Sequence, residues 1–333
     1  MSLTQLFSSD IRNHLNRAVH FRESLSLNTN AMRLVNGAGD GLKGLIIERF
    51  NKHMVVYILD AGWHSHKDTI SRFLCEHFDV EYLVFKNRAV SDTPAASAGM
   101  GEVLIDRRNS QTIVEENGLR FHVDLNAHLD AGLFLDMRQN RKRVASFARD
   151  KAVLNCFSYT CSFGVYCRKH GAARVINVDM SAKILIKGEE NYRLNGLPAD
   201  KSEFVRAHVI QYMERAAKHN NCFDIIILDP PSFSRYEGKV FSVKKDMPGM
   251  MEKALRILND AGILFVSTNL SSISYHQLEE WAFVATKKLR REIVKVDRMG
   301  QDRDFRASGS TKESSLSALL LKTRVLPELH GRD

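Results

Sequence analysis

The sequence is poor in cysteine, and its few cysteines are not spaced to bind zinc or to form a redox pair. There are five of them, and no two form a CxxC pair. Their positions are Cys75, Cys156, Cys161, Cys167 and Cys222. An odd number of cysteines without a secretory context also argues against a disulfide-rich scaffold. The sequence therefore predicts neither a metal site nor structural disulfides.

Long apolar runs are also missing. Residues 1–22 lack the continuous apolar core of a signal peptide. No stretch approaches the roughly 18 apolar residues that cross a bilayer. We therefore expect a cytoplasmic protein without a membrane partner. A GxGxxG fingerprint is absent too, which disfavours an oxidoreductase that binds a dinucleotide.

What the chain does contain is ordinary for a globular protein, apart from its charge. Hydrophobic residues make up 44% and charged residues 26% of the 333 positions. That composition and length suit a folded protein of about two domains. Lysine and arginine number 48 against 39 aspartates and glutamates, so the net charge is +9. This excess suits a polyanionic partner such as nucleic acid.

The sequence changes character twice along its length. Residues 1–30 are polar and basic, and predict a helical N-terminal extension. In residues 31–126 short apolar runs flank glycine-rich turns, as in MRLVNGAGDGLKGLIIERF, which predicts a small α+β domain. An RNA-binding role for this domain is a hypothesis. Residues 127–333 alternate strand-like and helix-like segments and predict an α/β domain.

Seven apolar segments of the last region predict strands. They are AVLNCF (152–157), ARVINVD (173–179), EFVRA (203–207), FDIIILD (223–229), GILFVST (262–268), EIVKVDR (292–298) and LSALLLK (316–322). Helical patterns lie between most of them, for example MPGMMEKALRILNDAG (247–262). Near-continuous apolar strands separated by helices indicate a parallel sheet covered on both faces. Ligands of such sheets bind beyond the carboxyl ends of the strands.

Polar groups follow the first two of these strands. The turn after the first strand carries the hydroxyls of Ser158, Thr160 and Ser162 and enters a helix. Such a turn suits an anion, although simple capping of the helix by Ser162 is the alternative. Asp179 ends the second strand, about twenty residues after that turn, where an acid commonly binds ribose hydroxyls. The pair predicts a cofactor that contains a nucleoside.

The fourth strand ends in Asp229-Pro230-Pro231-Ser232-Phe233. The two prolines stop the strand and fix the backbone. The turn therefore presents a carboxylate and an aromatic ring in set directions. An acceptor beside an aromatic ring can bind an unstacked base by hydrogen bonding and stacking.

In combination these segments resemble the class I S-adenosylmethionine-dependent methyltransferases of large-subunit (23S) ribosomal RNA, a group with cytosine-C5 and guanine-N7 enzymes. The matching segments are GDGLKGLIIERF, LDAGLFLDMRQNR, LNCFSYTCSFGVYC, INVDMS, ENYRLNG, FDIIILDPPSFS and QDRDFRASG. The resemblance implies a Rossmann-like sheet, mostly parallel with an antiparallel last strand, preceded by the small α+β domain. It implies S-adenosylmethionine as cofactor and 23S rRNA or a large-subunit precursor as partner. A homodimer stays open.

The resemblance also implies roles for individual residues. The cofactor-binding residues it implies are Asp136, Arg138, Phe157, Ser158, Tyr159, Thr160, Asp179, Met180 and Asp229. The residues it implies at the target base are Asp229, Pro230, Phe233 and Asn269. Two positions depart from the family pattern: Cys161 replaces a small residue, often glycine, and His208 stands where an acid often contacts adenine.

A basic run follows the segment FLDM, and we expect part of it to contact RNA. The run contains Arg141, Lys142, Arg143, Arg149 and Lys151, and the spacing of Arg138, Arg141 or Lys142, and Arg149 would place several basic residues on one helical face. Phosphate binding by this run is one reading, and a solvated charged helix is the other.

The target atom follows from the missing cysteines. Methylation of a pyrimidine C5 needs a thiolate that adds at C6, yet Ser232 and Asn269 occupy the places where that cysteine would lie. A base nitrogen needs no covalent step. We therefore predict methylation of a nitrogen, guanine N7 first. An exocyclic amine, cytosine C5 and a non-catalytic RNA-binding relative remain alternatives.

Overall fold

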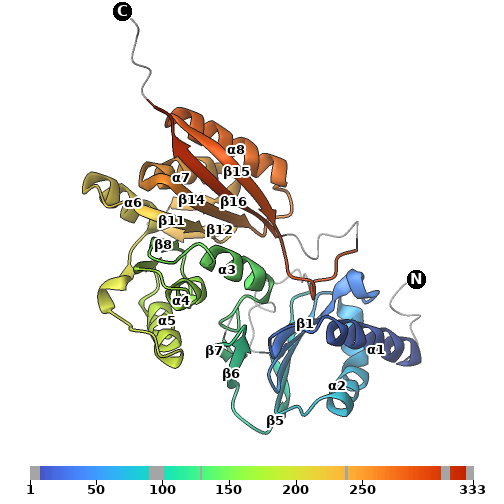
Figure 1. The fold of residues 1–333 in the computed structure, drawn as a ribbon. Helices are drawn as coiled ribbons and strands as arrows, with labels where there is room; N and C mark the ends of the chain where they lie inside the picture. The colour runs from blue at the N-terminus through green and yellow to red at the C-terminus, as the bar shows by residue number, and fades with distance from the viewer. Residues whose placement is uncertain (1–7, 90–100, 128–129, 237–238, 309–315, 328–333) are drawn as a thin grey trace, which may run out of the picture. The chain divides into compact units, whose positions relative to one another are not determined.

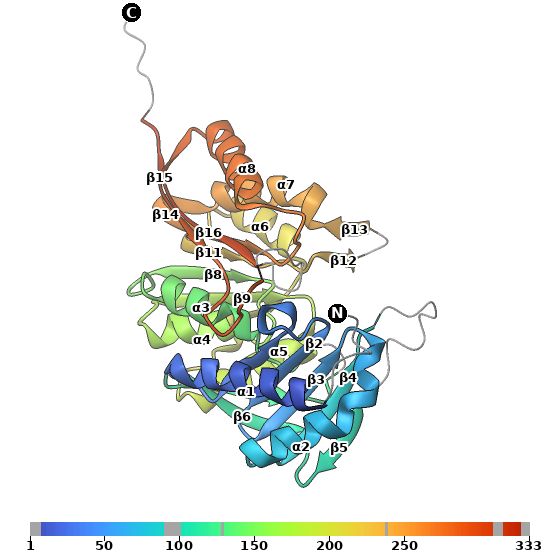
Figure 2. The same cartoon turned by 90° about the vertical axis from the view of Figure 1, so that its right-hand side faces the viewer.

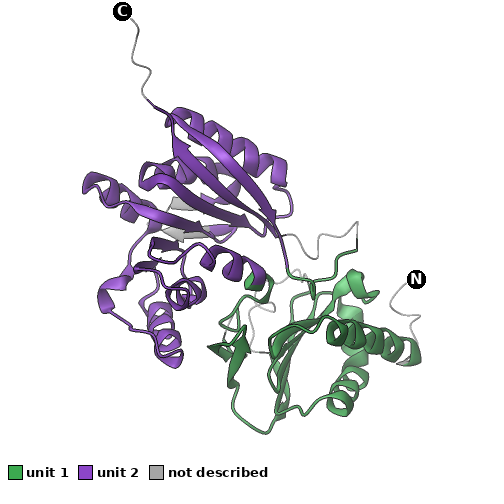
Figure 3. Ribbon diagram, in the orientation of Figure 1, with its two compact units in different colours: residues 1–138, 302–314 green, residues 139–301, 315–333 purple. Residues whose placement is uncertain are grey.

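The computed structural model divides the chain into two compact units (Figure 3). Unit 1 comprises residues 1–138 and 302–314, and unit 2 comprises residues 139–301 and 315–333. The structure describes residues 8–89, 101–127, 130–236, 239–308 and 316–327. The units differ from the predicted domains, because unit 1 runs on to Arg138 and takes in residues 302–314 near the end of the chain.

Unit 1 is built on a five-stranded sheet and a separate hairpin. Its helices are α1 (Ser8–Ser24) and α2 (Lys67–His77), with short 3-10 turns η2 (Gly37–Asp40), η3 (Ala61–His66) and η4 (Leu135–Met137). Its strands are β1 (Ala31–Asn36), β2 (Leu45–Phe50), β3 (His53–Ile58), β4 (Tyr82–Asn87), β5 (Glu102–Asp106), β6 (Gln111–Glu116) and β7 (Leu119–Asp124). The sheet order is β1-β2-β3-β4-β5, and only the pair β3–β4 is parallel.

The first helix is part of the core of unit 1. Helices α1 and α2 lie on the same face of the sheet (Figure 2), where Leu15 and Phe73 pack in one cluster with Val56 of β3. The prediction of a separate N-terminal extension is therefore corrected: the helix over Ser8–Ser24 packs into the core of unit 1. The polar, basic composition of residues 1–30 hides an apolar stripe that α1 buries completely, with Ile11 and Leu15 at 0% exposure.

Unit 2 alternates strands and helices. Its helices are α3 (Arg138–Ala145), which begins at the last residue of the first segment of unit 1, α4 (Ser162–Lys169), α5 (Ala182–Leu194), α6 (Val209–Lys218), α7 (Val243–Arg256) and α8 (Tyr275–Lys288), with the 3-10 turn η5 (Lys201–Glu203). Its strands are β8 (Ala152–Cys156), β9 (Arg174–Asp179), β10 (Phe204–Arg206), β11 (Phe223–Leu228), β12 (Phe233–Tyr236), β13 (Lys239–Ser242), β14 (Leu258–Thr268), β15 (Arg291–Met299) and β16 (Ser317–Val325).

Seven of these strands form one sheet in the order β10-β9-β8-β11-β14-β16-β15 (Figure 1). The first five are parallel, and β16 runs antiparallel to both of its neighbours. Helices α6, α7 and α8 share a core cluster with alternate strand residues such as Leu154 and Leu228. On the other face, Phe163 of α4 contacts Phe265 of β14 at 5.4 Å between ring centroids. The predicted fold class and all seven predicted strands are confirmed.

One helix boundary differs from the sequence pattern. We expected a helix over 247–262, but α7 spans Val243–Arg256 and contains Pro248 in its interior. The predicted last turn instead enters β14, which begins at Leu258. Among the described residues, no helix is long and apolar enough to span a bilayer.

Candidate active site

The predicted site residues of unit 2 gather at the carboxyl edge of its sheet. Strand β8 lies between β9 and β11, and the chain turns from one side of β8 to the other between these strands. This is the switch point at which open α/β sheets bind ligands. The turn after β8, Asp179 at the end of β9 and Asp229 after β11 all follow carboxyl ends of parallel strands.

The turn between β8 and α4 has an unusual backbone. Phe157, Tyr159 and Cys161 have φ angles of 56°, 49° and 62°, in the left-handed region that few side chains adopt. The intervening Ser158 and Thr160 are buried, at 6% and 1% exposure. Left-handed residues that alternate with ordinary ones create concave turns lined by N–H groups, which favour anionic or polar ligands. Strain of this kind persists only where the surroundings hold it.

Packing beneath the turn provides that support. The amide of Asn191 in α5 donates to the Thr160 carbonyl at 3.0 Å, and the Ser158 N–H donates to the Val178 carbonyl at 3.0 Å. Cys161 fits because its neighbour on α5 is Gly188: a Cβ there would lie 2.3 Å from the Cys161 Sγ. The larger residue at the family's small position is therefore matched by a missing side chain opposite.

Helix α4 is not capped by Ser162. Cys161 occupies the N-cap position and makes no side-chain capping bond. The alternative explanation for the hydroxyls, capping by Ser162, is therefore not observed.

The carboxylate of Asp179 is fixed in place by the neighbouring backbone. Its Oδ2 accepts the N–H of Tyr159 at 3.1 Å, and its Oδ1 accepts the N–H of Ser181 at 2.9 Å. Each carboxylate oxygen can accept two hydrogen bonds, so acceptor capacity remains for a ribose hydroxyl. Burial raises the pKa of Asp179, and the backbone N–H groups of Ser181, Tyr159 and Met180 oppose that shift.

Hydrogen bonds join the turn Asp229–Phe233 after β11, the DPP turn, to the end of β14. The hydroxyl of Ser267 donates to Asp229 Oδ1 at 2.6 Å, and the hydroxyl of Ser232 donates to Asn269 Oδ1 at 2.7 Å. Asp229 and Asn269, which the sequence placed at the target base, are thus brought together through two serines. The sequence did not predict a site role for Ser267 or Ser232, because only the pairing of β11 with β14 brings them close to Asp229 and Asn269.

An aromatic ring stands exposed beside these bonds. Phe233 is 63% exposed, although Pro230 two residues after the strand is buried. A large apolar side chain held in the open by a rigid turn is costly in water and suits a stacking partner. Phe157 is half-buried, and its ring lies 6.2 Å from that of Phe241 in β13.

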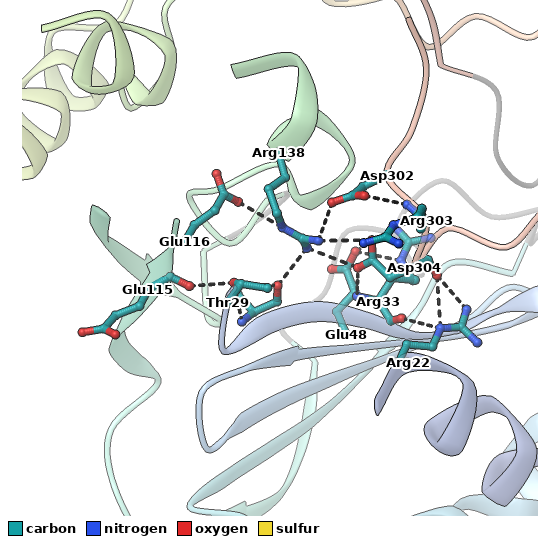
Figure 4. A network of polar contacts seen from close by, with 11 residues as sticks. Arg22, Thr29, Arg33, Glu48, Glu115, Glu116, Arg138, Asp302, Arg303 and Asp304 are labelled. Carbon is teal, nitrogen blue, oxygen red and sulfur yellow. Dashed lines mark hydrogen bonds and ion pairs between the residues drawn. The ribbon is translucent and has the colours of Figure 1, made fainter. Parts of the chain in front are cut away.

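Arg138 takes part in a buried ion-pair network of unit 1 (Figure 4). Its guanidinium lies 2.7 Å from Asp302, 3.2 Å from Asp304 and 3.6 Å from Glu116, and it donates to the Ala31 carbonyl at 3.0 Å. The side chain is 1% exposed. These partners explain Arg138 without a cofactor, so the predicted cofactor contact gains no support.

The network continues through Asp304. Its carboxylate accepts the backbone N–H of Arg33 at 2.9 Å, and its carbonyl accepts both Nε and Nη2 of Arg22, at 3.1 and 2.7 Å (Figure 4). Arg22 also forms a buried pair with Asp40. The QDRDFR motif therefore supplies carboxylates to the core of unit 1.

The roles predicted for Asp136 and Met180 stay predictions, and His208 remains a departure from the family pattern. Asp136 is half-buried in η4 of unit 1, and its contact with the cofactor stays a prediction. Met180 is 39% exposed directly after Asp179, beside the ribose-binding position that we expect. His208 precedes α6 as its N-cap residue and offers no carboxylate for adenine. Among the described residues, no group of histidines, cysteines and acids is arranged to hold a metal ion.

Comparison with known proteins connects this geometry to a family. A family model described as S-adenosylmethionine-dependent methyltransferase matches residues 80–321. YwbD of Bacillus subtilis (strain 168) is 30% identical over 315 residues, which cover 93% of this chain and 79% of YwbD. Ribosomal RNA large subunit methyltransferase I of Photobacterium profundum is 30% identical over 274 residues, 82% of this chain and 69% of that protein.

A solved structure agrees with the fold and the cofactor. The crystal structure of SMU.776 complexed with SAH superposes with a TM-score of 0.85 at 26% identity, over 96% of this chain and 82% of that chain. The carboxylate of Asp179, the strained turn after β8 and the DPP turn are the groups that we predict to hold S-adenosylmethionine here. The chain belongs to the S-adenosylmethionine-dependent methyltransferases, in the family that includes ribosomal RNA large subunit methyltransferase I and YwbD.

Proposed function

We propose that the protein methylates a base nitrogen of large-subunit (23S) rRNA in the cytoplasm, with guanine N7 as the preferred atom. The name of the Photobacterium relative supports the substrate class. The observation that carries the proposal is the geometry of the turn after β11: Asp229 and Asn269 are held by Ser267 and Ser232, beside the exposed ring of Phe233. Hydrogen bonding and stacking at one place are what a base extruded from its RNA requires.

The thiols of the chain support a nitrogen target. Cys156 and Cys161 at the carboxyl edge are completely buried, and burial raises the pKa of both thiols far above the usual value. A thiol of this kind is a poor nucleophile, because the thiolate is the reactive form. Cys167 is buried within α4, Cys222 precedes β11 at the opposite end of that strand, and Cys75 belongs to α2 of unit 1.

A nitrogen acceptor makes small demands on the protein. S-adenosylmethionine supplies an electrophilic methyl group when it is bound. The N7 lone pair forms the new bond to that methyl carbon while the carbon–sulfur bond breaks, and its electron pair stays on sulfur. N7 carries no proton, so no general base is needed. The residues then act by positioning: Asp229 accepts from N–H groups of the base, Phe233 stacks on it, and Asn269 orients it.

Cytosine C5 is the alternative, because the resembled family contains C5 enzymes. The two chemistries separate in one experiment, since C5 transfer passes through a covalent enzyme–RNA adduct that 5-fluorocytidine traps. Purified protein, S-adenosylmethionine and 23S rRNA transcribed with 5-fluorocytidine should give methylated RNA and no adduct on a denaturing gel. An adduct that forms only with S-adenosylmethionine would overturn the nitrogen assignment.

A further inference from the structure

Two lysines occupy the first turn of α7, where helix physics does not favour them. Lys244 and Lys245 follow the first residue of the helix, and both are exposed. The N-terminus of a helix carries partial positive charge, so acids stabilise this turn and lysines oppose it. Asp246 satisfies the local requirement by accepting the Ser242 N–H at 2.8 Å. Within the described part of the chain, neither lysine forms an ion pair with a carboxylate.

Backbone hydrogen bonds place these lysines beside the candidate active site. The N–H of Val243, the residue before Lys244, donates to the carbonyl of Ser232 in the DPP turn at 3.2 Å. The hydroxyl of the same Ser232 donates to Asn269. Two residues before Val243, Phe241 packs against Phe157 of the turn between β8 and α4, the cofactor turn. The lysine turn is therefore anchored directly to the turn that presents Phe233.

Three members of the basic run that the sequence suggested for phosphate binding are less suitable. Arg141 is 1% exposed, with its guanidinium 5.9 Å from the ring centroid of Tyr166. Arg143 pairs with Asp297 at 2.7 Å, and Lys151 lies 4.0 Å from Asp224. A buried arginine cannot meet an RNA backbone, and paired side chains have less to gain from a phosphate.

We propose that Lys244 and Lys245 bind the RNA phosphates that flank the target nucleotide. The inference rests on the proposed function and adds to it the surface that holds the RNA strand. A nucleotide whose base stacks on Phe233 keeps its phosphates on either side, close to the turn anchored at Ser232. Two ammonium groups there neutralise phosphates and release counterions. They contribute affinity without reading the sequence of the RNA.

The test is the salt dependence of RNA binding by the full-length chain. We compare the wild type, the double variant Lys244→Gln/Lys245→Gln and the matched control Lys218→Gln/Lys287→Gln. The control removes two exposed lysines from the C-terminal turns of α6 and α8 in the same unit. The probe is unmodified transcribed 23S rRNA, titrated between about 0.05 and 0.2 M salt. Binding of S-adenosylhomocysteine by each variant reports whether the cofactor site is intact.

The expected result is a weaker salt dependence in the test variant alone. Removing two phosphate contacts lowers the slope of log affinity against log salt by about 1.4 to 1.8, so the salt-induced fall in affinity is about tenfold smaller over this range. The control should keep the wild-type slope, and all three proteins should bind S-adenosylhomocysteine equally.

Two results would overturn the proposal while leaving the proposed function in place. One is a wild-type slope in the test variant, and the other is an equal loss in the control, both with rRNA still methylated. If the wild type neither binds nor methylates 23S rRNA, the proposed function fails and this surface fails with it.

Discussion

The two units use charge in different ways. Unit 1 contains 18 lysines and arginines against 20 acids, whereas unit 2 contains 30 against 19. The net positive charge of the chain therefore comes entirely from unit 2, which carries the turn between β8 and α4. Unit 1 uses arginines internally, with Arg22 and Arg138 almost completely buried among carboxylates. The overall net charge of +9 is therefore not shared evenly. Unit 1 contains buried ion pairs, whereas the excess of basic residues in unit 2 suits a polyanion.

The difference bears on the predicted RNA-binding role of residues 31–126. That role stays a prediction, and the balance of charge in unit 1 gives it no electrostatic support. The charge of unit 2 favours it as the principal source of phosphate affinity.

The sharpest way to break the comparison is to remove one arginine from each unit. Arg138→Met leaves three buried carboxylates without their partner and should destabilise unit 1 by about 3–5 kcal/mol. Arg143→Met removes an exposed pair with Asp297 in unit 2 and should cost about 0–1 kcal/mol. The chain has two tryptophans, Trp63 in unit 1 and Trp281 in unit 2. Urea unfolding followed by Trp63 fluorescence in a Trp281→Phe background measures the first loss.

A wild-type midpoint for Arg138→Met would show that the network does not stabilise unit 1. A large loss for Arg143→Met would contradict the distinction between the units.

A carboxylate of unit 2 should behave in the opposite way, costing affinity rather than stability. Asp179→Asn removes acceptors for the ribose, and a charge-assisted hydrogen bond contributes about 1.5–3 kcal/mol, roughly ten- to a hundredfold in affinity. Calorimetric titration with S-adenosylhomocysteine measures the loss, and an unchanged unfolding midpoint is the control. Unchanged affinity would mean that the ribose binds elsewhere.

Packing beneath the cofactor turn can also be tested. Gly188→Ala places a Cβ against the Cys161 Sγ and should destabilise unit 2 by about 1–3 kcal/mol. Cys161→Gly removes that sulfur and accepts the left-handed φ of 62° without strain. The double variant should therefore recover most of the loss, as followed by Trp281 fluorescence in a Trp63→Phe background. Additive effects of the two substitutions would show that the contact does not govern the turn.

The smallest expected effect is a pH dependence specific to unit 2. We predict that the carboxylate form of Asp179 binds ribose, and burial raises the pKa of this group. Affinity for S-adenosylhomocysteine is therefore retained above that pKa and lost as the pH falls through it, at a higher pH than for an ordinary aspartate. The same titration of Asp179→Asn should lack this step. A step that persists in the variant would assign the titration to another group.

Sequence patterns were enough to predict the sheet and its polar edge. Near-continuous apolar runs bounded by turns located all seven strands, and the polar residues that end those runs, Asp179 and Asp229, lie where the topology requires. The partners of Arg138 could not be predicted, since Asp302 and Asp304 follow it by 164 and 166 residues. The same is true of the match between Cys161 and Gly188, which depends on how α5 packs against the turn.

The proposed RNA-binding surface at Lys244 and Lys245 could not be predicted from the sequence. The helical pattern of the sequence covers 247–262 and leaves Lys244 and Lys245 outside the expected helix. The structure begins the helix at Val243 and anchors it to Ser232. The hydrogen bond from Val243 to Ser232 therefore fixes a first helical turn that the local pattern does not include.

The most direct test of the central claim is the identity of the methylated nucleoside. Unmodified 23S rRNA is incubated with the protein and S-adenosylmethionine bearing a deuterated methyl group, then digested to nucleosides and analysed by liquid chromatography and mass spectrometry. The account predicts deuterated 7-methylguanosine, and roughly ten- to a hundredfold less of it with Asp179→Asn when the cofactor concentration is limiting. Deuterated 5-methylcytidine as the product would contradict it.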